Sequence, residues 1–337
     1  MIKRLTLWLA LAGAGTVHAE MDRASFIGLG ASVLKIEVMR AQGGYSLGSG
    51  VVVRPDKVVT NCHVTRDASQ IHILRGGARW RVGSQAVDVE HDLCVLHAPG
   101  VKANVVTMGR SADLKVGQPL MALGFTGGLG LQNSAGDVVA LHRHDSSHVI
   151  QSTNWFSSGA SGGGLFDDEL RLVGILTYRL RGGAAHYFAA PVDWLQGMLD
   201  DSARYLPVQP MAADLLPYWQ KPAALQPNFL RASLFERDGD WTALESLAAR
   251  WILADEYDAQ AWYRHGVALA QLNRLPDAQQ ALERSVNIEP AFCEAWLRLG
   301  LIYARQGQRS NALEARAKLE ALKSVLAAQL GQAIEKL

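Results

Sequence analysis

Short apolar runs broken by Gly, Asn and Asp fill the chain from Ser32 to about Pro191. Runs of this length, rich in Val, Ile and Leu, predict β-strands. Many short strands joined by glycine-bearing turns favour a sandwich or a barrel. The predicted strands are Val33–Met39, Gly50–Val53, Lys57–Thr60, Ser69–Leu74, Leu93–His97, Leu120–Leu123, Asp137–Leu141, His148–Gln151, Leu172–Tyr178 and His186–Ala190.

The last third of the chain has a helical period and repeats itself. Trp262 and Trp296 lie 34 residues apart, and the stretch 296–303 fits the W-x₂-L-G-x₂-Y opening of a tetratricopeptide repeat. A weaker earlier copy uses Ala232, Phe235 and Gly239, which lie 34 residues before Gly266, Leu269 and Asn273. We therefore predict three helical repeat units and a capping helix, because each unit buries its apolar face on its neighbours.

Two further segments set the expected domain organisation. Prolines are dense between residues 200 and 227, which predicts an extended connector. At the N-terminus, Lys3 and Arg4 precede an apolar run that ends near Ala19, as in a cleaved secretory signal peptide; an uncleaved membrane anchor is the alternative. The expected division is 1–19 signal peptide, 20–200 β domain, 201–227 proline-rich linker and 228–337 tetratricopeptide-repeat domain.

Composition narrows the class of protein. Of the 337 residues, 49% are hydrophobic and 19% charged, which is typical of a globular protein. The formal net charge of +1 gives no strong attraction to nucleic acid or anionic lipid. We expect no nucleic-acid partner, and contact with a membrane only through the signal segment before cleavage. The expected location is periplasmic or secreted, an oxidising compartment.

Three segments carry candidate functional residues. The stretch 48–53 and the following Thr60-Asn61-Cys62-His63-Val64 present a histidine at a strand end. Asp92 then opens the apolar run Leu93–Leu96, and Ser161 lies within Ser158-Gly159-Ala160-Ser161-Gly162-Gly163. Each motif alone has an ordinary structural explanation, and Asp88 is a rival to Asp92. In this order they combine a nucleophile, a base and a group that orients the base.

From about Ile36 to Leu195 the chain resembles trypsin-like serine proteases, most closely the bacterial HtrA/Deg type. The resemblance implies a double six-stranded β-barrel with a catalytic triad of His63, Asp92 and Ser161 in the cleft between barrels. It implies an oxyanion hole formed by the amides of Gly159 and Ser161, and a supporting hydroxyl from Thr177 for the aspartate. It implies no cofactor and no metal. The expected fold class is multidomain, an all-β protease domain followed by an all-α repeat domain.

The sequence departs from that family at two positions near the serine. Ala160 stands where the family usually has Asp or Asn, so the ion pair that orders the oxyanion turn of trypsins cannot form. Gly164 replaces the usual proline, which loosens the turn. These changes leave the resting order of the Gly159 turn open.

Two cysteines flank the expected acid and base. If His63 and Asp92 touch, Cys62 and Cys94 lie on neighbouring strands, which predicts a Cys62–Cys94 disulfide worth roughly 3 kcal/mol. Two buried free thiols are the alternative. Cys293 lies in a repeat helix as a small buried residue. His142, His144 and His148 form a cluster for which a solvated turn is favoured over a metal site.

By resemblance, the pocket for the residue before the cleaved bond involves bulky side chains, which indicates a shallow pocket for small apolar residues. Trp155 stands six residues before Ser161, where a preference for Lys or Arg would require an acid. The expected pocket residues are Trp155, Phe156, Thr177, Tyr178, Arg179, Tyr187 and Phe188.

The resulting prediction is an exported serine endopeptidase whose helical repeats recruit a protein partner or substrate. The rival is an inactive protease fold that acts as a binding or scaffold protein through its repeats. An esterase with a G-x-S-x-G elbow is disfavoured, because its residues follow the order Ser, Asp, His.

Overall fold

The computed structural model describes residues 23–127, 130–180 and 186–335, so the predicted signal peptide lies outside the described residues. The first β unit is an eight-stranded antiparallel sheet in the order β14-β6-β7-β3-β2-β1-β4-β5. A short helix, α2 (Cys62–Thr65), follows β3. The strands are β1 (Val33–Arg40), β2 (Tyr45–Arg54), β3 (Lys57–Thr60), β4 (Ala68–Arg75), β5 (Ala78–Arg81), β6 (Ser84–Asp88), β7 (Leu93–His97) and β14 (Leu206–Pro207).

The second β unit is a closed six-stranded barrel in the order β10-β13-β12-β11-β8-β9. Pairing of β9 with β10 closes it, so every strand in it has two neighbours. The strands are β8 (Pro119–Phe125), β9 (Leu131–His144), β10 (Ser147–Ser152), β11 (Gly164–Phe166), β12 (Leu172–Leu180) and β13 (His186–Pro191).

The resemblance implied two six-stranded barrels, and the structure has one closed barrel and one open sheet. In the first unit, β5 and β14 stand at the two ends of the strand order, and no pairing joins them within the described part of the chain. The strand β14 has two residues and comes from the predicted linker. The connector therefore lengthens this sheet at one edge.

A shared apolar core holds the two β units against each other. Val51, Val59 and Val95 of the first sheet belong to the same buried cluster as Leu123 and Ile175 of the barrel. Each unit also has a cluster of its own, so the shared one lies between them. This packing fixes the distance between segments that carry the candidate site residues.

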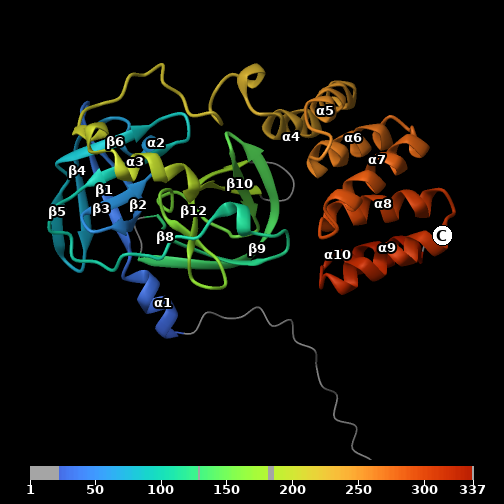
Figure 1. Ribbon diagram of the computed structural model, residues 1–337, viewed down its shortest axis with the longest axis horizontal. Coiled ribbons are helices and arrows are strands. Elements are labelled where there is room, and N and C mark those ends of the chain that lie inside the picture. The colour runs from blue at the N-terminus through green and yellow to red at the C-terminus, as the bar shows by residue number, and fades with distance from the viewer. Residues whose placement is uncertain (1–22, 128–129, 181–185, 336–337) are drawn as a thin grey trace, which may run out of the picture.

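The C-terminal region is a stack of helices beyond the barrel (Figure 1). Between residues 228 and 335, three consecutive helix pairs are followed by one closing helix, in agreement with the predicted repeats. Two glycines 34 residues apart permit close packing, because a Cβ at Gly266 would lie 2.6 Å from Leu282, and one at Gly300 would lie 2.4 Å from Leu330. The helices are α4 (Asn228–Asp238), α5 (Trp241–Ala254), α6 (Ala259–Gln271), α7 (Leu275–Ile288), α8 (Cys293–Arg305), α9 (Arg309–Ala321) and α10 (Leu326–Ile334); α1 (Arg23–Gly30) and α3 (Gln196–Asp200) belong to the β region.

The predicted linker crosses the β region before it reaches α4 (Figure 1). We call residues 208–227 the strap. Tyr218 of the strap is buried in a cluster that combines Tyr178 and Phe188 of the barrel with Phe229 of α4. The first helix pair and the barrel therefore share a core, and the strap between them is packed against both.

The histidine cluster is not a solvated turn, and that prediction was wrong. His142 is buried on β9, where its ring stacks on Phe229 at 4.4 Å between centroids. The turn itself is Asp145–Ser146, between β9 and β10. Because strand side chains alternate, His142 and His144 share the face of β9 that the helical region covers. Their aromatic rings serve as packing surface for α4 and the strap.

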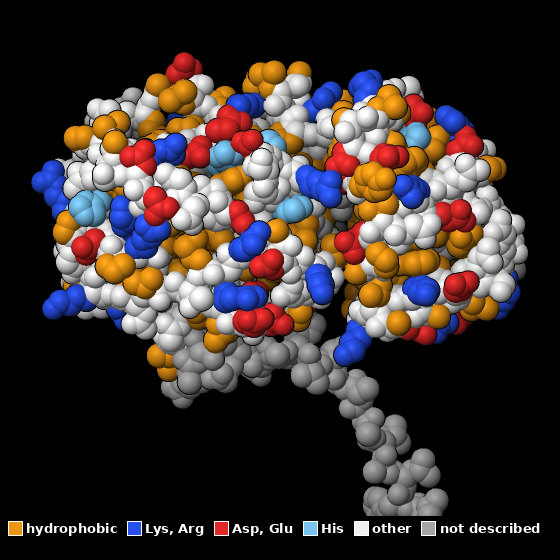
Figure 2. All heavy atoms as spheres, in the orientation of Figure 1, with side chains coloured by type: hydrophobic (Ala, Val, Ile, Leu, Met, Phe, Trp, Pro, Cys, Tyr) orange, Lys and Arg blue, Asp and Glu red, His pale blue; other side chains and the backbone are white. Residues whose placement is uncertain are grey.

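The surface carries charges of both signs in close mixture. Figure 2 shows blue and red side chains interspersed over both halves of the face in view, with no large field of one sign. Among the described residues, no helix has both the length and the apolar character needed to cross a bilayer.

Candidate active site

His63 and Asp92 meet at the edge of the first sheet. His63 lies in α2, directly after β3, and Asp92 directly precedes β7, the neighbour of β3 in the sheet. Asp92 has a φ of +59°, a conformation that Asp adopts more readily than most residues. Its Oδ2 lies 2.6 Å from His63 Nδ1, and its Oδ1 accepts a hydrogen bond of 2.8 Å from the backbone N–H of His63.

The Asp92 carboxylate is almost completely buried, with 1% of the residue exposed, whereas the His63 side chain is 25% exposed. A buried carboxylate requires hydrogen-bond donors, and here both oxygens have them. With Nδ1 occupied by the acid, Nε2 of the ring remains to accept a proton. The pair has the arrangement of an oriented base.

A disulfide joins Cys62 and Cys94, with their Cα atoms 5.0 Å apart. Thr60 is the register partner of Cys94, so the chain leaves β3 beside β7 and brings Cys62 within reach. The bond ties the residue before the histidine to the residue two after the aspartate. Cys293, half-buried at the start of α8, is free.

Ser161 lies in a turn between the barrel and the first sheet, and protein donors occupy five consecutive carbonyl oxygens of that turn. Gly127 N–H donates to Ser158 at 2.8 Å, the Ser49 hydroxyl donates to Gly159 at 2.8 Å, and Ser49 N–H donates to Ser161 at 2.8 Å. The carbonyls of residues 157 and 160 accept from residues 160 and 163 at 3.0 and 2.8 Å.

The amides of Gly159 and Ser161 contrast with those carbonyls. Neither donates to any group among the described residues. Gly159 has a φ of +97°, which a side chain would oppose, so the backbone turn at this position requires a glycine. Two free amides separated by one residue make a site for a developing oxyanion.

Close packing explains the glycines that follow the serine. A Cβ at Gly162 would lie 2.1 Å from the carbonyl oxygen of Ser49, and one at Gly163 would lie 2.3 Å from that of Leu123. The turn is therefore wedged between β2 and β8, the adjacent strands of the two β units. Ser161 lies near the segment of His63, because a Cβ at Gly48 of β2 would lie 2.5 Å from Val64 and 3.3 Å from the Ser161 carbonyl oxygen.

The Ser161 hydroxyl is not hydrogen-bonded to His63 within the described part of the chain. It donates instead to the carbonyl oxygen of Thr177, at 3.4 Å. A bond of that length is weak, and rotation about χ1 releases it at little cost. In free enzymes the bonds of a catalytic site are often longer than in the substrate complex.

Ala160 is buried with 1% exposed and packs against Gly124 of β8, where a Cβ would lie 3.0 Å from it. The turn is ordered here without a carboxylate at this position, because Ser49 holds it from the other side. The Ser49 hydroxyl both donates to Gly159 and accepts from Phe125 N–H at 2.8 Å. The motif 48–50 was recognised from the sequence, but the role of this serine was not.

The predicted pocket residues fall into two groups. Trp155 is 54% exposed and, with Phe156 and Ala160, lines a cavity of about 10 Å³, room for about one water molecule. Arg179 is also exposed. The other five are buried, and four of them form aromatic pairs, since Phe156 contacts Tyr187 and Tyr178 stacks on Phe188. The assignment of these residues to a substrate pocket stays a prediction.

Thr177 does not have the role expected from the resemblance. Its hydroxyl donates to the Ile175 carbonyl at 2.7 Å and accepts from Asn61 at 3.2 Å, and no hydrogen bond joins it to Asp92 among the described residues. The third donor to the carboxylate is Trp219 Nε1 of the strap, 3.3 Å from Oδ2. The sequence signal that was overlooked is an adjacent Tyr-Trp pair inside a proline-rich segment, because exposed linkers rarely carry two large aromatic residues.

Asp88, the rival acid, pairs with a different histidine. Its Oδ2 lies 2.7 Å from His91 Nδ1, and the other ring nitrogen of His91 lies 2.8 Å from Asp145 of the barrel. Burial lowers the pKa of His91, but the two carboxylates outweigh it and raise the pKa above its ordinary value. The ring also stacks on Trp194 at 4.0 Å, so His91 links the first sheet to the barrel.

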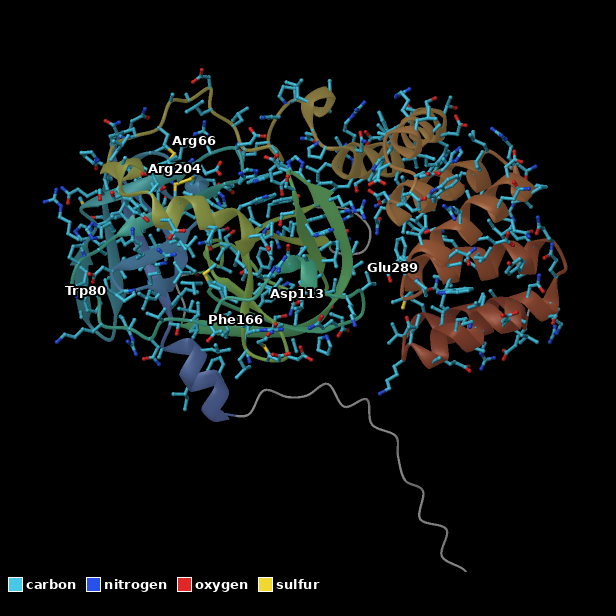
Figure 3. All side chains as sticks on the ribbon, viewed as in Figure 1. Arg66, Trp80, Asp113, Phe166, Arg204 and Glu289 are labelled. Carbon is cyan, nitrogen blue, oxygen red and sulfur yellow. A yellow bond between two sulfur atoms is a disulfide. The ribbon has the colours of Figure 1, made fainter. Side chains whose placement is uncertain are left out.

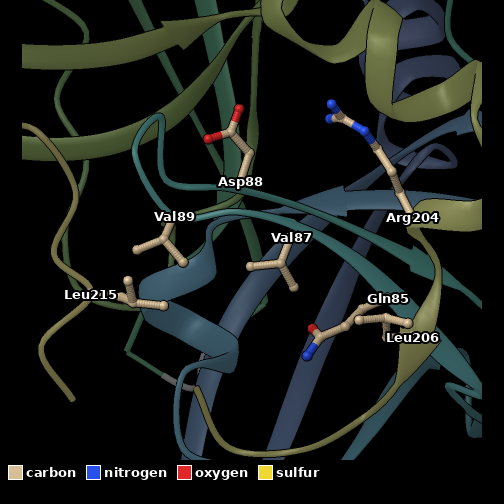
Figure 4. A pocket seen from close by; sticks show the side chains of 7 residues that line it. All are labelled: Gln85, Val87, Asp88, Val89, Arg204, Leu206 and Leu215. Atoms are coloured by element: carbon tan, nitrogen blue, oxygen red, sulfur yellow. The ribbon is translucent and has the colours of Figure 1, made fainter. Parts of the chain in front are cut away.

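A cavity of about 520 Å³ lies on β6, and Ser161 is not among the residues that line it. Figure 4 shows it between β6 and the segment after α3. Asp88 and Arg204 stand at one side of it, and Val87, Leu206 and Leu215 supply apolar surface. Within the described part of the chain, no group of three or more potential metal ligands is clustered.

Comparison with known families finds one match in the β region and one in the helical region. The model for the trypsin-like peptidase domain matches residues 48–175, which include His63, Asp92 and Ser161. The model for the tetratricopeptide repeat matches residues 259–292, the pair α6 and α7.

Among curated proteins, the chain is similar to the chloroplastic Protease Do-like 1 of Arabidopsis thaliana, 34% identical over 173 residues, or 47% of this chain and 39% of that protein. It is also similar to a probable periplasmic serine endoprotease, DegP-like, of Halomonas elongata, 32% identical over 164 residues, or 46% of this chain and 35% of that protein. The chain therefore spans less than half the length of these relatives. The Rv3671c protease of M. tuberculosis in its active form has the same fold, with a TM-score of 0.52 at 20% identity over 63% of this chain and 97% of that one.

Proposed function

Because the chain contains a trypsin-like peptidase domain similar to HtrA/Deg proteases, followed by tetratricopeptide repeats, we propose that it is an exported serine endopeptidase. The observation that carries this proposal is the conjunction of a buried, hydrogen-bonded His63–Asp92 pair with two amides, on either side of Ala160, that donate to no group in the described part of the chain.

In the proposed mechanism, Ser161 attacks the carbonyl carbon of the scissile peptide bond. His63 Nε2 takes the hydroxyl proton as the bond forms and later gives it to the leaving amine. Asp92 fixes the tautomer through Nδ1 and stabilises the imidazolium ion. Water then attacks the acyl-enzyme by the same route and releases the second product.

The tetrahedral intermediate places a negative charge on the former carbonyl oxygen. We assign its stabilisation to the N–H groups of Gly159 and Ser161. A donor of this kind is typically worth about 3–4 kcal/mol of the barrier. The hydrogen bonds on the neighbouring carbonyls support this assignment, because a flip of the Ser158–Gly159 peptide, which carries the Gly159 N–H, would break the 2.8 Å bond between the Ser158 carbonyl and Gly127 N–H.

The rival function, an inactive scaffold, is favoured by the absence of a family carboxylate at residue 160. The hydrogen bonds of Ser49 weaken that argument, since they hold the turn by another route. For the helical repeats we propose the recruitment of a protein partner or substrate, as stacked repeats present a concave surface. The relatives described as periplasmic support an exported location.

A fluorophosphonate probe, which reacts with activated serines, tests the proposed enzyme. The wild-type chain should be labelled at Ser161, and Ser161→Ala should abolish labelling. Ser157→Ala, four residues earlier in the same turn, is the matched control and should be labelled. A wild-type protein that is folded but unlabelled would refute the proposed enzyme and support the rival function, an inactive scaffold. A peptide-library cleavage profile of the labelled enzyme would then test the predicted preference for small apolar side chains.

A further inference from the structure

We propose that Trp219, supplied by the strap, is a positioning residue for the His63–Asp92 pair. Its indole N–H is the third donor to the buried carboxylate, and its ring lies against the histidine. The inference rests on the proposed function, because it assigns a role within that same site. It adds a residue outside the segment that matches the peptidase family, residues 48–175.

The first argument is the set of donors around Asp92. Its oxygens accept from the His63 backbone at 2.8 Å, from His63 Nδ1 at 2.6 Å and from Trp219 Nε1 at 3.3 Å. The first two donors belong to one residue, so they cannot hold the carboxylate independently of the histidine. Trp219 is the donor from a separate element, and it fixes the plane of the carboxylate against rotation away from the ring.

The second argument is the packing of the indole. Its ring meets the His63 ring edge to face, with centroids 5.8 Å apart and planes at 88°. Its other contact is Tyr178 of β12, on which it stacks at 4.8 Å and 15°. Tyr178 is in turn stacked on Phe188 at 4.8 Å and 8°. A ring held between a buried aromatic stack and the histidine has little freedom to turn its N–H away from Asp92.

The third argument is that the strap is fastened on both sides of the pair. Arg66, three residues after His63, donates from one guanidinium nitrogen to the carbonyls of residues 213 and 215 at 2.7 and 2.6 Å, and Figure 3 shows it beneath the strap. Glu90, two residues before Asp92, accepts from Tyr218 N–H at 3.0 Å and forms an ion pair with Lys221. Trp219 is therefore anchored to the same two loops that carry the base and the acid.

The helical region helps to fix Trp219 through the strap. Gln226, just before α4, donates to the carbonyls of Trp219 and Lys221 at 3.1 and 2.8 Å. Phe229 of α4 and Tyr218 belong to one buried cluster. The donor set of the catalytic acid is thus complete only when the strap and the first repeat are docked on the barrel.

The test compares Trp219→Phe with Trp262→Phe in the full chain. Phenylalanine keeps an aromatic ring against Tyr178 and His63 but removes the N–H. Trp262 is the matched control, because its Nε1 also donates one hydrogen bond, to the Glu256 carbonyl at 2.9 Å, in a repeat helix. Two quantities are measured, the rate of fluorophosphonate labelling and, with a cleaved peptide, kcat separately from KM.

We expect Trp219→Phe to lower the labelling rate and kcat about tenfold, the kinetic equivalent of one hydrogen bond to a charged group, with little change in KM. Trp262→Phe should leave both unchanged. Equal rates for Trp219→Phe and wild type would overturn the inference and leave the endopeptidase standing. A rise in KM alone would overturn it too, because Trp219 would then act on peptide binding.

A second readout does not depend on turnover. The His63 Nδ1–H proton gives a strongly deshielded NMR signal when bonded to a carboxylate at 2.6 Å, and loss of the signal in His63→Ala assigns it. We expect this signal to shift in Trp219→Phe and not in Trp262→Phe. An unlabelled wild type would refute the proposed enzyme, whereas an unshifted signal would refute the positioning role by itself.

Discussion

The two halves of the candidate site are held in different ways. His63 and Asp92 are fastened by direct hydrogen bonds, the Cys62–Cys94 disulfide and the indole of Trp219. Ser161 is held by backbone hydrogen bonds in a glycine turn and, among the residues that the structure describes, by one side chain, Ser49. The acid–base half is rigid before substrate arrives, whereas the nucleophile half depends on one hydroxyl and on close packing. Different substitutions should therefore damage the two halves separately.

The largest effect is expected from removing the charge of the acid. Asp92→Asn presents an amide to Nδ1 and favours the wrong tautomer, so kcat/KM should fall about 10⁴-fold. Rates of peptide hydrolysis by wild type and Asp92→Asn measure this loss, and circular dichroism verifies that the variant is folded. Asp88→Asn is the control, since that carboxylate binds His91 instead, and it should keep activity near wild type. A greater loss in Asp88→Asn than in Asp92→Asn would reverse the assignment.

The second prediction concerns Ser49, whose replacement should impair the half of the site that contains Ser161. In Ser49→Ala the carbonyl of Gly159 and the amide of Phe125 lose their shared partner, so no side chain of β2 ties down the turn that presents the Gly159 N–H. We expect kcat/KM to fall about 10- to 100-fold, somewhat less than the loss of a whole oxyanion donor. Ser69→Ala is matched, because its hydroxyl also donates to a backbone carbonyl of the same sheet, Met39, at 3.0 Å. Equal activity of the two variants would show that packing alone orders the turn.

Loss of the Cys62–Cys94 disulfide should lower the stability of the protein more than its activity. Replacing Cys62 and Cys94 together by Ala should lower the free energy of unfolding by about 3 kcal/mol, because the unfolded chain gains freedom. Urea unfolding measures this change, and Cys293→Ala serves as the control. At 25 °C the variant should retain most of its activity, since the His63–Asp92 contacts remain. Loss of activity in the folded protein would mean that the disulfide itself aligns the pair.

The smallest effect concerns the link between the first sheet and the barrel at His91. Burial lowers the pKa of His91 but Asp88 and Asp145 raise it further, so its folded-state pKa lies above about 6.5, the unfolded value. The stabilisation is therefore complete below about pH 6.5 and is lost as pH rises through the raised pKa. Because Asp145 is exposed, Asp145→Asn should remove less than about 1 kcal/mol at pH 6. Thermal unfolding of wild type and Asp145→Asn measures this difference in stability, which should be smaller at pH 9 than at pH 6. A difference that stays constant with pH would show that it does not come from the charge of His91.

Much of the site could be predicted because its signals are local in the sequence. The glycines around Ser161, the residue types at His63 and Asp92 and the 34-residue period each reflect a requirement that neighbouring residues satisfy. The Cys62–Cys94 bond also followed, once acid and base were expected to touch. The open first sheet and the buried histidines could not be predicted from the sequence, because the pairing of β14 and the docking of α4 depend on segments far away in the chain.

The sequence by itself determined which side chains have the chemistry of a nucleophile, a base and an acid, and that helical repeats follow them. Only the tertiary structure decided what holds these groups in place. Ser49 reaches Gly159 across 110 residues, and Trp219 reaches Asp92 across 127. Contacts at such separations leave no pattern in either neighbourhood, since they exist only once the strap has docked and the two β units have packed together.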